Sequence, residues 1–161
     1  MNVYFCSDLH LGHKLASTLR GFDSIAEHDE HIIQELQKVC HKRTVLWILG
    51  DVAMSQASFK ELWRLEGRLI LVRGNHDVLP EELYRNRFEK IHGIIRYKQM
   101  WLTHCPIHPQ EMYRCKANLH GHIHKNTNSP ELPLPYININ WDFWKRPLSL
   151  DEIKTLRDQE V

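Results

Sequence analysis

The most informative stretch of this sequence is residues 69–77, which read Leu69-Ile70-Leu71-Val72-Arg73-Gly74-Asn75-His76-Asp77. The first four residues form a short, bulky, apolar run, which is typical of a buried strand. The run is followed by a glycine and by three side chains that can bind metal ions or transfer protons. This pattern predicts a buried strand whose carboxyl end carries chemically active groups.

The same arrangement recurs at four other places in the chain. The apolar runs that precede polar side chains are residues 3–6, 44–49, 99–103 and 117–120. The polar groups that follow them are Asp8 and His10, Asp51, His104, and His122 with His124. Ligands of open α/β sheets bind beyond the carboxyl ends of the strands. We therefore expect the five loops to converge on one site if these strands share a core.

Helices are predicted between and after these runs. They cover residues 25–39, residues 58–65, a segment that begins at Pro80, and residues 150–157. The first of them has apolar side chains at three- and four-residue steps, as an amphipathic helix has. Ser58 is the expected cap of the second helix, and Ser149 or Asp151 is the expected cap of the last.

Two more segments, residues 94–97 and 136–141, are predicted strands, and residues 125–135 are rich in Asn and Pro, which favours a loop. Strands and helices alternate early in the chain, whereas strands predominate late. This order predicts an α/β (α+β) fold. A length of 161 residues suits one domain, so we expect residues 1–161 to form a single domain.

Composition excludes some classes of protein. The net charge of +1 gives no basic surface for nucleic acid, although it does not rule out a nucleic-acid substrate. No apolar run approaches the roughly 20 residues that span a bilayer, and the N-terminus lacks the pattern of a signal peptide. We therefore expect a cytosolic protein with no membrane contact. Its four cysteines have no tight pair spacing, which favours reduced, structural thiols.

The polar groups at the strand ends form a set of metal-binding donors. They comprise two carboxylates, one Asn amide and five imidazoles. Oxygen and imidazole donors without thiolate suit Mn, Fe, Zn, Co or Ni, and they do not suit a structural zinc cage. Because side chains alternate along an extended chain, the spacings Asp8-x-His10 and His122-x-His124 are expected to place two donors on one side.

Five motifs in this order resemble those of the calcineurin-like metallophosphoesterase family. They are Asp8-x-His10, Gly50-Asp51, Gly74-Asn75-His76-Asp77, His104, and Gly121-His122-x-His124. The resemblance implies a four-layer sandwich of two mixed β-sheets flanked by helices. It also implies two divalent metal ions, with Mn favoured. One ion would be held by Asp8, His10, Asp51 and His124, and the other by Asp51, Asn75, His104 and His122.

The resemblance also implies roles for residues around the metal ligands. Asp51 would be a bridging carboxylate for two cations ~3.5–4 Å apart, which share a hydroxide that attacks phosphorus. His76 would face the substrate and assist the leaving group, whereas Arg73 and His13 could contact phosphate. We expect Asp77 to cap the segment before Pro80 rather than to orient His76. The aromatic cluster at residues 141–144 is expected to fill the core rather than to lie under the site.

The expected reaction is hydrolysis of a phosphodiester or an activated phosphomonoester. The chain is short for the resembled family and leaves little room for a cap domain, so we expect an open site and a small substrate, with a nucleotide as one candidate. Its compactness is similar to that of small bacterial or phage phosphodiesterases. Two alternatives stay open, namely a small metal-dependent nuclease and a non-catalytic metal-binding scaffold in a protein complex.

Overall fold

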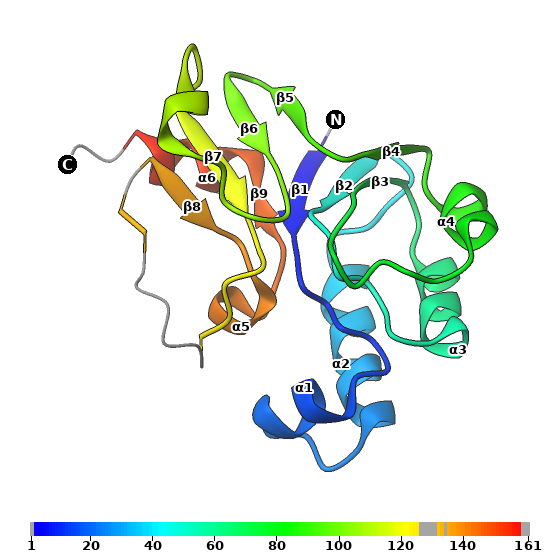
Figure 1. Cartoon of the computed structure of the whole chain (residues 1–161). Helices are drawn as coiled ribbons and strands as arrows, with labels where there is room; N and C mark the ends of the chain where they lie inside the picture. Colours follow the sequence, from blue (N-terminus) through cyan, green and yellow to red (C-terminus); the bar gives the residue numbers. More distant parts are fainter. Residues whose placement is uncertain (1, 126–131, 134, 159–161) are drawn as a thin grey trace.

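The structure, a computed structural model, describes residues 2–125, 132–133 and 135–158. Two β-sheets lie face to face at its centre (Figure 1). The larger sheet has the strand order β4-β3-β2-β1-β9 and the smaller has the order β5-β6-β7-β8. Among the described residues, no helix is both long and apolar enough to cross a membrane.

The larger sheet is mostly parallel. Its strands are β1 (Asn2–Cys6), β2 (Thr44–Ile48), β3 (Arg68–Val72), β4 (Lys90–His92) and β9 (Leu148–Ser149). The first four run parallel to their neighbours, and β9 pairs antiparallel with β1. The carboxyl ends of β1, β2 and β3 therefore lie at one edge of the sheet.

The smaller sheet is also mixed. Its strands are β5 (Ile95–Tyr97), β6 (Met100–Leu102), β7 (Ala117–His120) and β8 (Tyr136–Asn138). The hairpin of β5 and β6 is antiparallel, whereas β6, β7 and β8 run parallel. A hydrogen bond from Trp141 N to Ser7 O, 3.0 Å long, joins the chain after β8 to the end of β1. This contact brings the strand ends of the two sheets together.

Alternating side chains of the central strands build two cores. Leu46 and Ile48 of β2 pack toward the helices, whereas Val45 and Trp47 pack toward the smaller sheet. The helices on the outer face are α2 (Ile25–Gln37), α3 (Gln56–Lys60) with a 3-10 turn at Glu61–Arg64, and α4 (Glu81–Arg87). The closing helix α6 (Leu150–Arg157) joins the core between the sheets through Ile153.

The predicted fold class is therefore present, with two mixed sheets flanked by helices. Several details differ from the sequence prediction. Ser55, not Ser58, caps α3, because its side chain accepts the amide of Ser58. The last predicted strand ends early, and Trp141–Trp144 form a short helix, α5, capped by Asn140. Ser149 caps α6 in a reciprocal capping box with Glu152. Of the predicted loop at residues 125–135, residues 126–131 and 134 lie outside the described residues.

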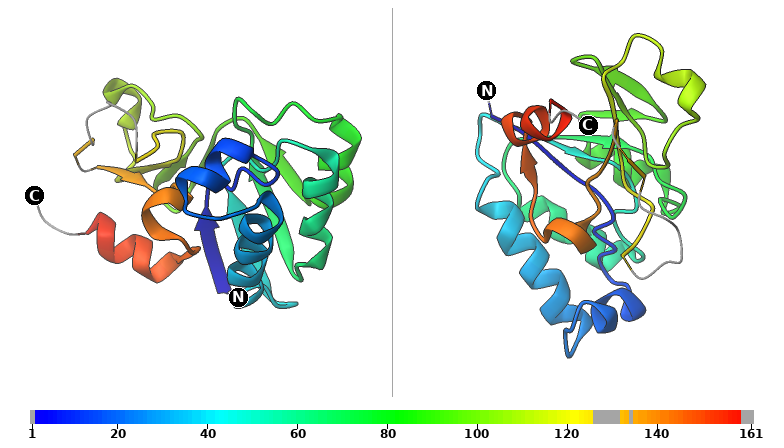
Figure 2. Two further views of the ribbon diagram at one scale, coloured as in Figure 1. Left: turned by 90° about the horizontal axis from the view of Figure 1, so that it is seen from below. Right: turned by 90° about the vertical axis from the view of Figure 1, so that its left-hand side faces the viewer.

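A helix that the sequence pattern did not predict lies beside the strand ends. It is α1 (Lys14–Leu19), which starts after His13, whose ring accepts the amide of Ala16. Figure 2 shows α1 beyond the carboxyl end of β1. Two of its apolar side chains, Leu15 and Leu19, are exposed, so the helix buries little apolar surface of its own. It has only six residues, which is too short for a clear helical period.

Candidate metal centre

Sharp turns after the strands position the polar side chains. Asp8, His10, Asp51 and His122 have φ angles of 56°, 51°, 55° and 66°, in the left-handed region that residues other than glycine rarely adopt. The prediction that Asp8-x-His10 and His122-x-His124 lie on extended chain is therefore wrong. Backbone bonds hold the turns, since Asp8 N donates to Gly50 O and His10 N to Asp51 O, each at 3.0 Å. Backbone strain of this kind is typical of functional sites.

Close backbone approach explains two of the glycines in these loops. A Cβ atom on Gly121 would lie 2.1 Å from Asp8 Oδ2, and one on Gly74 would lie 2.3 Å from Asp51 Oδ1. The loops therefore pack directly against the carboxylates of their neighbours. Any larger residue at these positions would displace a carboxylate of the site.

The first cluster of donors contains Asp8, His10 and His124. His10 Nε2 lies 3.2 Å from His124 Nε2 and 3.8 Å from Asp8 Oδ1. His124 Nε2 lies 3.6 Å from Asp8 Oδ1. Asp8 is fully buried, and its Oδ2 accepts the hydroxyl of Ser7 at 2.6 Å and the amide of His122 at 3.0 Å. Its Oδ1 is therefore the oxygen that is nearest to the imidazoles.

The second cluster contains Asn75, His104 and His122. Asn75 Oδ1 lies 3.0 Å from His104 Nε2 and 3.1 Å from His122 Nδ1, and these two ring nitrogens are 3.3 Å apart. His104 Nδ1 lies 2.7 Å from Leu49 O. Because a carbonyl oxygen can only accept, Nδ1 carries a proton, and Nε2 has a lone pair to offer the cluster only when the ring is neutral.

Asp51 joins the two clusters. Its Oδ2 lies 3.7 Å from His10 Nε2 and 3.3 Å from His104 Nε2. Its Oδ1 accepts the amide of His76 at 2.9 Å, which fixes the orientation of the carboxylate. The structure thus brings together all seven side chains that the sequence predicts as metal ligands, with Asp51 in the middle.

The electrostatics of these groups fit a cation site. Burial alone would raise the pKa of Asp51, but the contact with His104, the amide of His76 and the nearby His10 together outweigh it and lower the pKa to about 2. Burial alone would lower the pKa of His104, but the carboxylates of Asp51 and Asp8 outweigh it and raise the pKa to about 9. A proton on His104 therefore balances carboxylate charge at a position where a metal ion would do the same. His10 Nδ1, buried, has no hydrogen-bond partner among the described residues.

The outer side of His124 is held by a network that the sequence did not predict. His124 Nδ1 lies 2.7 Å from Asp142 Oδ2, and Arg20 donates through Nε to Asp142 Oδ1 at 2.8 Å. Arg20 also donates to Leu9 O at 2.8 Å and to Asp8 O at 2.7 Å. One guanidinium thus fixes both the turn that carries Asp8 and the carboxylate that orients His124.

The charges of this network shift the pKa values of His124 and Asp142 in opposite directions. The bond to Asp142, which outweighs burial, raises the pKa of His124. Burial alone would raise the pKa of Asp142, but His124 and Arg20 outweigh it and lower the pKa. Asp142 belongs to the aromatic segment 141–144, for which the sequence favoured a core role. Trp141 is indeed buried, but its neighbour reaches the site.

Asp77 holds the loop that carries Asp51. Its Oδ2 accepts the amides of Asp51 at 3.0 Å and Gly74 at 2.8 Å, and its Oδ1 accepts the amide of Val52 at 2.9 Å. None of these amides belongs to residues 78–80, the segment that Asp77 was expected to cap, and α4 begins after Pro80 with no side-chain cap bond. The expected capping role is therefore wrong, because the turn after β3 directs this carboxylate inward, where it is buried.

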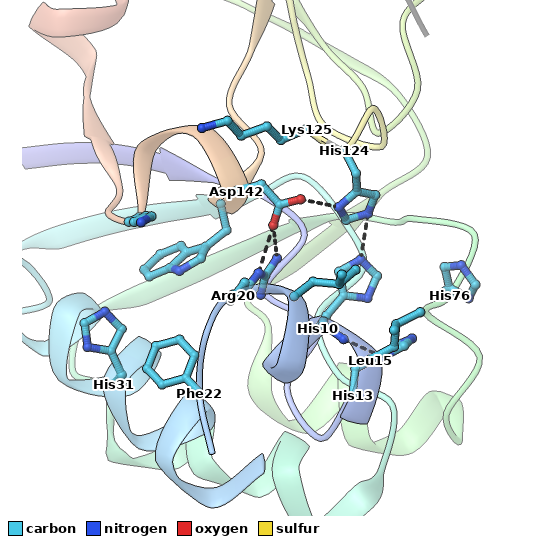
Figure 3. A pocket seen from close by; sticks show the side chains of 14 residues that line it. His10, His13, Leu15, Arg20, Phe22, His31, His76, His124, Lys125 and Asp142 are labelled. Carbon is cyan, nitrogen blue, oxygen red and sulfur yellow. Dashed lines mark hydrogen bonds and ion pairs between the residues drawn. The ribbon is translucent and has the colours of Figure 1, made fainter. Parts of the chain in front are cut away.

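Other predicted residues lie around the centre. His76 is exposed, with its ring 5.9 Å from the ring of His10. The ring of His13 lies 5.4 Å from that of His10, and both His76 and His13 line a cavity beside the first cluster (Figure 3). Burial lowers the pKa of His13, and the neighbouring His10 and His76 add to this. Arg73 lies apart from this cavity, because it pairs with Glu81 at 2.5 Å and stacks on Tyr84.

Cys105 is a neighbour of the second cluster that the sequence did not single out. Its Sγ and ring nitrogens of His104 and His122 lie within 4.8 Å of one another. Burial, together with the nearby carboxylates of Asp51 and Asp8, raises the pKa of this thiol. A protonated thiol is a poor metal ligand. Its place directly after His104 is the only signal in the sequence that points to it.

Comparison with known proteins identifies the family. A family model of calcineurin-like phosphoesterases matches residues 1–146. The chain belongs to this family. Relatives include the Gene 66 proteins of Mycobacterium phages D29 and L5, which are 28% and 29% identical. The alignments cover 96% of this chain in both cases, and 95% and 93% of the phage proteins.

Cellular organisms have relatives of the same size. An uncharacterized protein of Methanocaldococcus jannaschii is 28% identical over 96% of this chain and 90% of its own length. The crystal structure of a protein of unknown function from Aquifex aeolicus, 29% identical, aligns with a TM-score of 0.77 over 96% of this chain and 98% of that one. Family membership and the clustered Asp and His side chains together support a metal-dependent phosphoesterase.

Proposed function

We propose that this chain hydrolyses a phosphodiester or an activated phosphomonoester with the help of two divalent metal ions. The proposal rests above all on the position of Asp51 Oδ2, between His10 Nε2 at 3.7 Å and His104 Nε2 at 3.3 Å. One carboxylate oxygen that lies within reach of two donor clusters suits a pair of cations. The family also implies a phosphate-ester substrate.

Each ion would be held by side chains from several loops. The proposed ligands of the first are Asp8, His10, Asp51 and His124, and those of the second are Asp51, Asn75, His104 and His122. This mixture of oxygen and imidazole donors suits Mn, Fe, Zn, Co or Ni, and we favour Mn. When bound, such ions lower the pKa of water and neutralise charge on the phosphoryl oxygens.

His76 is the proposed general acid. Its backbone amide donates to Asp51 Oδ1 at 2.9 Å, while its ring is exposed and lines the cavity. A ring in this position can give its proton to the ester oxygen as the bond to phosphorus breaks, so that the product leaves as an alcohol. His13 lines the same cavity and is a candidate phosphate contact, whereas Arg73 is already paired with Glu81.

The two alternative functions have less support. A non-catalytic scaffold would not need His76 or a complete donor set, yet every predicted ligand lies in the cluster. A nuclease would be favoured by a strongly basic chain, and the net charge of +1 gives no such support. A cytosolic location and a single domain over residues 1–161 stay predictions.

A substrate panel tests the proposed function. The protein is reconstituted with Mn²⁺, Co²⁺, Ni²⁺ or Zn²⁺ and assayed from about pH 5 to about pH 9 with an aryl phosphodiester, an aryl phosphomonoester and single-stranded DNA. We expect turnover of an aryl ester and two bound ions per chain, with both lost together in Asp51→Asn. Fewer than one ion per chain, or no turnover with any metal, would overturn the proposal, and preferred cleavage of DNA would favour the nuclease.

A further inference from the structure

A large cavity extends from the candidate metal centre along α1 and α5. Its volume is about 690 Å³, and both His10 and His124 of the first cluster line it. Figure 3 shows His76 and His124 at one end, with Phe22 and His31 at the other. Cavities of roughly 300–1,000 Å³ hold whole small-molecule ligands. A phosphate group alone would leave most of this space empty, so the cavity can also take the organic part of an ester.

Part of the cavity surface is apolar. Leu15 and Leu19 are one helical turn apart on α1 and are 60% and 58% exposed. Phe22, which follows α1, and the buried Trp141 of α5 also line the cavity. Exposed leucines gathered beside a reactive centre indicate a surface that a ligand covers. The ligand therefore has an apolar part.

The polar part of the lining favours an anion. Lys125 and Lys145 are exposed at the cavity, and Arg20 lies among its lining residues. Among the described residues that line it, Asp142 is the only acid, and its charge is already matched by Arg20 and His124. The ligand that complements this lining is an anion with an apolar group, as a phosphate ester is.

The aromatic and imidazole rings that line the cavity favour a flat base over a flexible alkyl chain as the apolar part of the ligand. The ring of Phe22 lies 5.2 Å from the ring of His31, and His13 lies at the opposite side of the cavity, next to His10. An alkyl chain cannot form hydrogen bonds with imidazole groups, so it needs a lining that is apolar on all sides. A nucleobase instead packs its face on apolar or aromatic side chains and offers hydrogen-bonding edges to imidazoles.

We propose that this cavity binds the nucleoside part of a nucleotide substrate, with the base on Leu15, Leu19 and Phe22. The phosphate then points toward His10 and His124. This assignment rests on the proposed function, because it places the ester beside the candidate metal centre. Lys125 and Lys145 add attraction for the anion.

The test measures binding rather than turnover. Three phosphonates, in which carbon replaces the ester oxygen so that hydrolysis cannot occur, are titrated calorimetrically: those of adenosine, ribose and a hexyl chain. Each titration is run with and without Mn²⁺. We expect the adenosine compound to bind at least about tenfold more tightly than the ribose compound, since stacking of one base commonly contributes that much. The hexyl compound should bind no better than the ribose compound.

A double variant connects this difference to the cavity. Leu15→Ser with Leu19→Ser changes only exposed side chains, and it should lower the ratio of adenosine to ribose affinity toward one, with Phe22 keeping its share of the contact. The matched control is Ile94→Ser, an exposed apolar residue outside the cavity, which should keep the ratio. Because both ligands carry the same charge, the ratio is insensitive to general electrostatic changes.

The outcomes separate this proposal from the proposed function. Equal affinity for the adenosine and ribose compounds, or tighter binding of the hexyl compound, would overturn the nucleoside assignment even if Mn²⁺ strengthened all three. A ratio that survives the double variant would overturn the assigned position. A preserved ratio with no effect of Mn²⁺ would instead support the cavity and count against the metal centre.

Discussion

His124 Nδ1 lies 2.7 Å from Asp142 Oδ2, and this contact faces away from the donor cluster that His124 Nε2 joins. A carboxylate behind an imidazole fixes the ring and its tautomer, and it makes the opposite nitrogen a better metal donor. Arg20 in turn fixes Asp142 through a second bond of 2.8 Å. The network is therefore expected to control the first metal position without touching a metal ion itself.

Removing the charge of Asp142 tests this expectation. Asp142→Asn should weaken binding at the first metal position by roughly 10- to 100-fold, because His124 loses its carboxylate partner. Binding at the position of His104 and His122 should change much less. Calorimetric titration with Co²⁺ measures both. The matched control is Asp158→Asn, which breaks an exposed pair with Arg157, and it should change neither affinity. Equal weakening at both positions would contradict the role of Asp142.

The carboxylate of Asp77 is expected to matter for stability as well as for the site. It accepts three backbone amides, and burial raises its pKa. In Asp77→Asn an amide nitrogen would face one of those N–H groups, so the folded protein should lose about 1–3 kcal/mol. Chemical denaturation of the metal-free protein measures the loss. An unchanged free energy of unfolding would show that these bonds contribute little.

A methyl group at residue 121 should disrupt Asp8. Its Cβ would lie 2.1 Å from Asp8 Oδ2 and 2.3 Å from Ser7 Oγ, both of which are buried. Gly121→Ala should therefore cost about 1–3 kcal/mol and lower affinity at the first metal position. The control is Gly93→Ala, because a Cβ there has nothing within 4 Å. Thermal unfolding and metal titration of both variants give the comparison, and similar behaviour of the two would contradict the argument.

Metal binding should depend steeply on pH. The carboxylates of Asp51 and Asp8 outweigh burial and raise the pKa of His104 to about 9, so a metal ion must displace its proton at neutral pH. Affinity should then rise by roughly tenfold per pH unit for each displaced proton until that pKa is passed. Titrations with Mn²⁺ at several pH values measure the slope. A flat profile between pH ~6 and ~8 would show that His104 loses no proton on binding.

The same shift has a consequence for the metal-free protein. A group whose pKa is higher in the folded state stabilises the fold fully below its unfolded pKa, and this contribution is lost as the pH rises through the folded value. For His104 the window runs from its ordinary pKa of 6.5 to about 9. The melting temperature without metal should therefore fall across this window, and Mn²⁺ should restore it. A rise across the window would contradict the assigned shift.

The positions of the candidate metal ligands could be predicted from the sequence because they depend on short, local segments. Each donor follows its own apolar strand within a few residues, so strand prediction and donor position come from the same short segment. Parallel pairing of β1, β2 and β3 then brings Asp8, Asp51 and Asn75 to one edge. The left-handed turns were missed, because they depend on bonds such as that from Asp8 N to Gly50 O rather than on local preference.

The supporting contacts could not be predicted from local patterns. Arg20 and Asp142 are 122 residues apart, and Asp77 is 26 residues from Asp51. Arg20 and Asp142 are of common residue types with no distinctive spacing, and the place of Asp77 in its motif does not tell which backbone amides it accepts. Their roles follow from packing between the two sheets and α1, which is a property of the whole fold. The short elements α1, β4 and β9 were missed for the related reason that few residues carry too little periodicity.

His76→Ala is the change that best separates chemistry from metal binding. His76 contributes its backbone amide to Asp51, and alanine keeps that amide, so metal content should stay near normal. Its ring is the proposed proton donor, and its loss should lower kcat by roughly 10²–10⁴-fold. The loss should be largest for esters with poor leaving groups and smallest for aryl esters, whose leaving oxygens need no proton. His41→Ala, at an exposed histidine that does not line the cavity, is the control. If His76→Ala loses its metal ions, or loses the same factor with all leaving groups, the ring does not act as the acid.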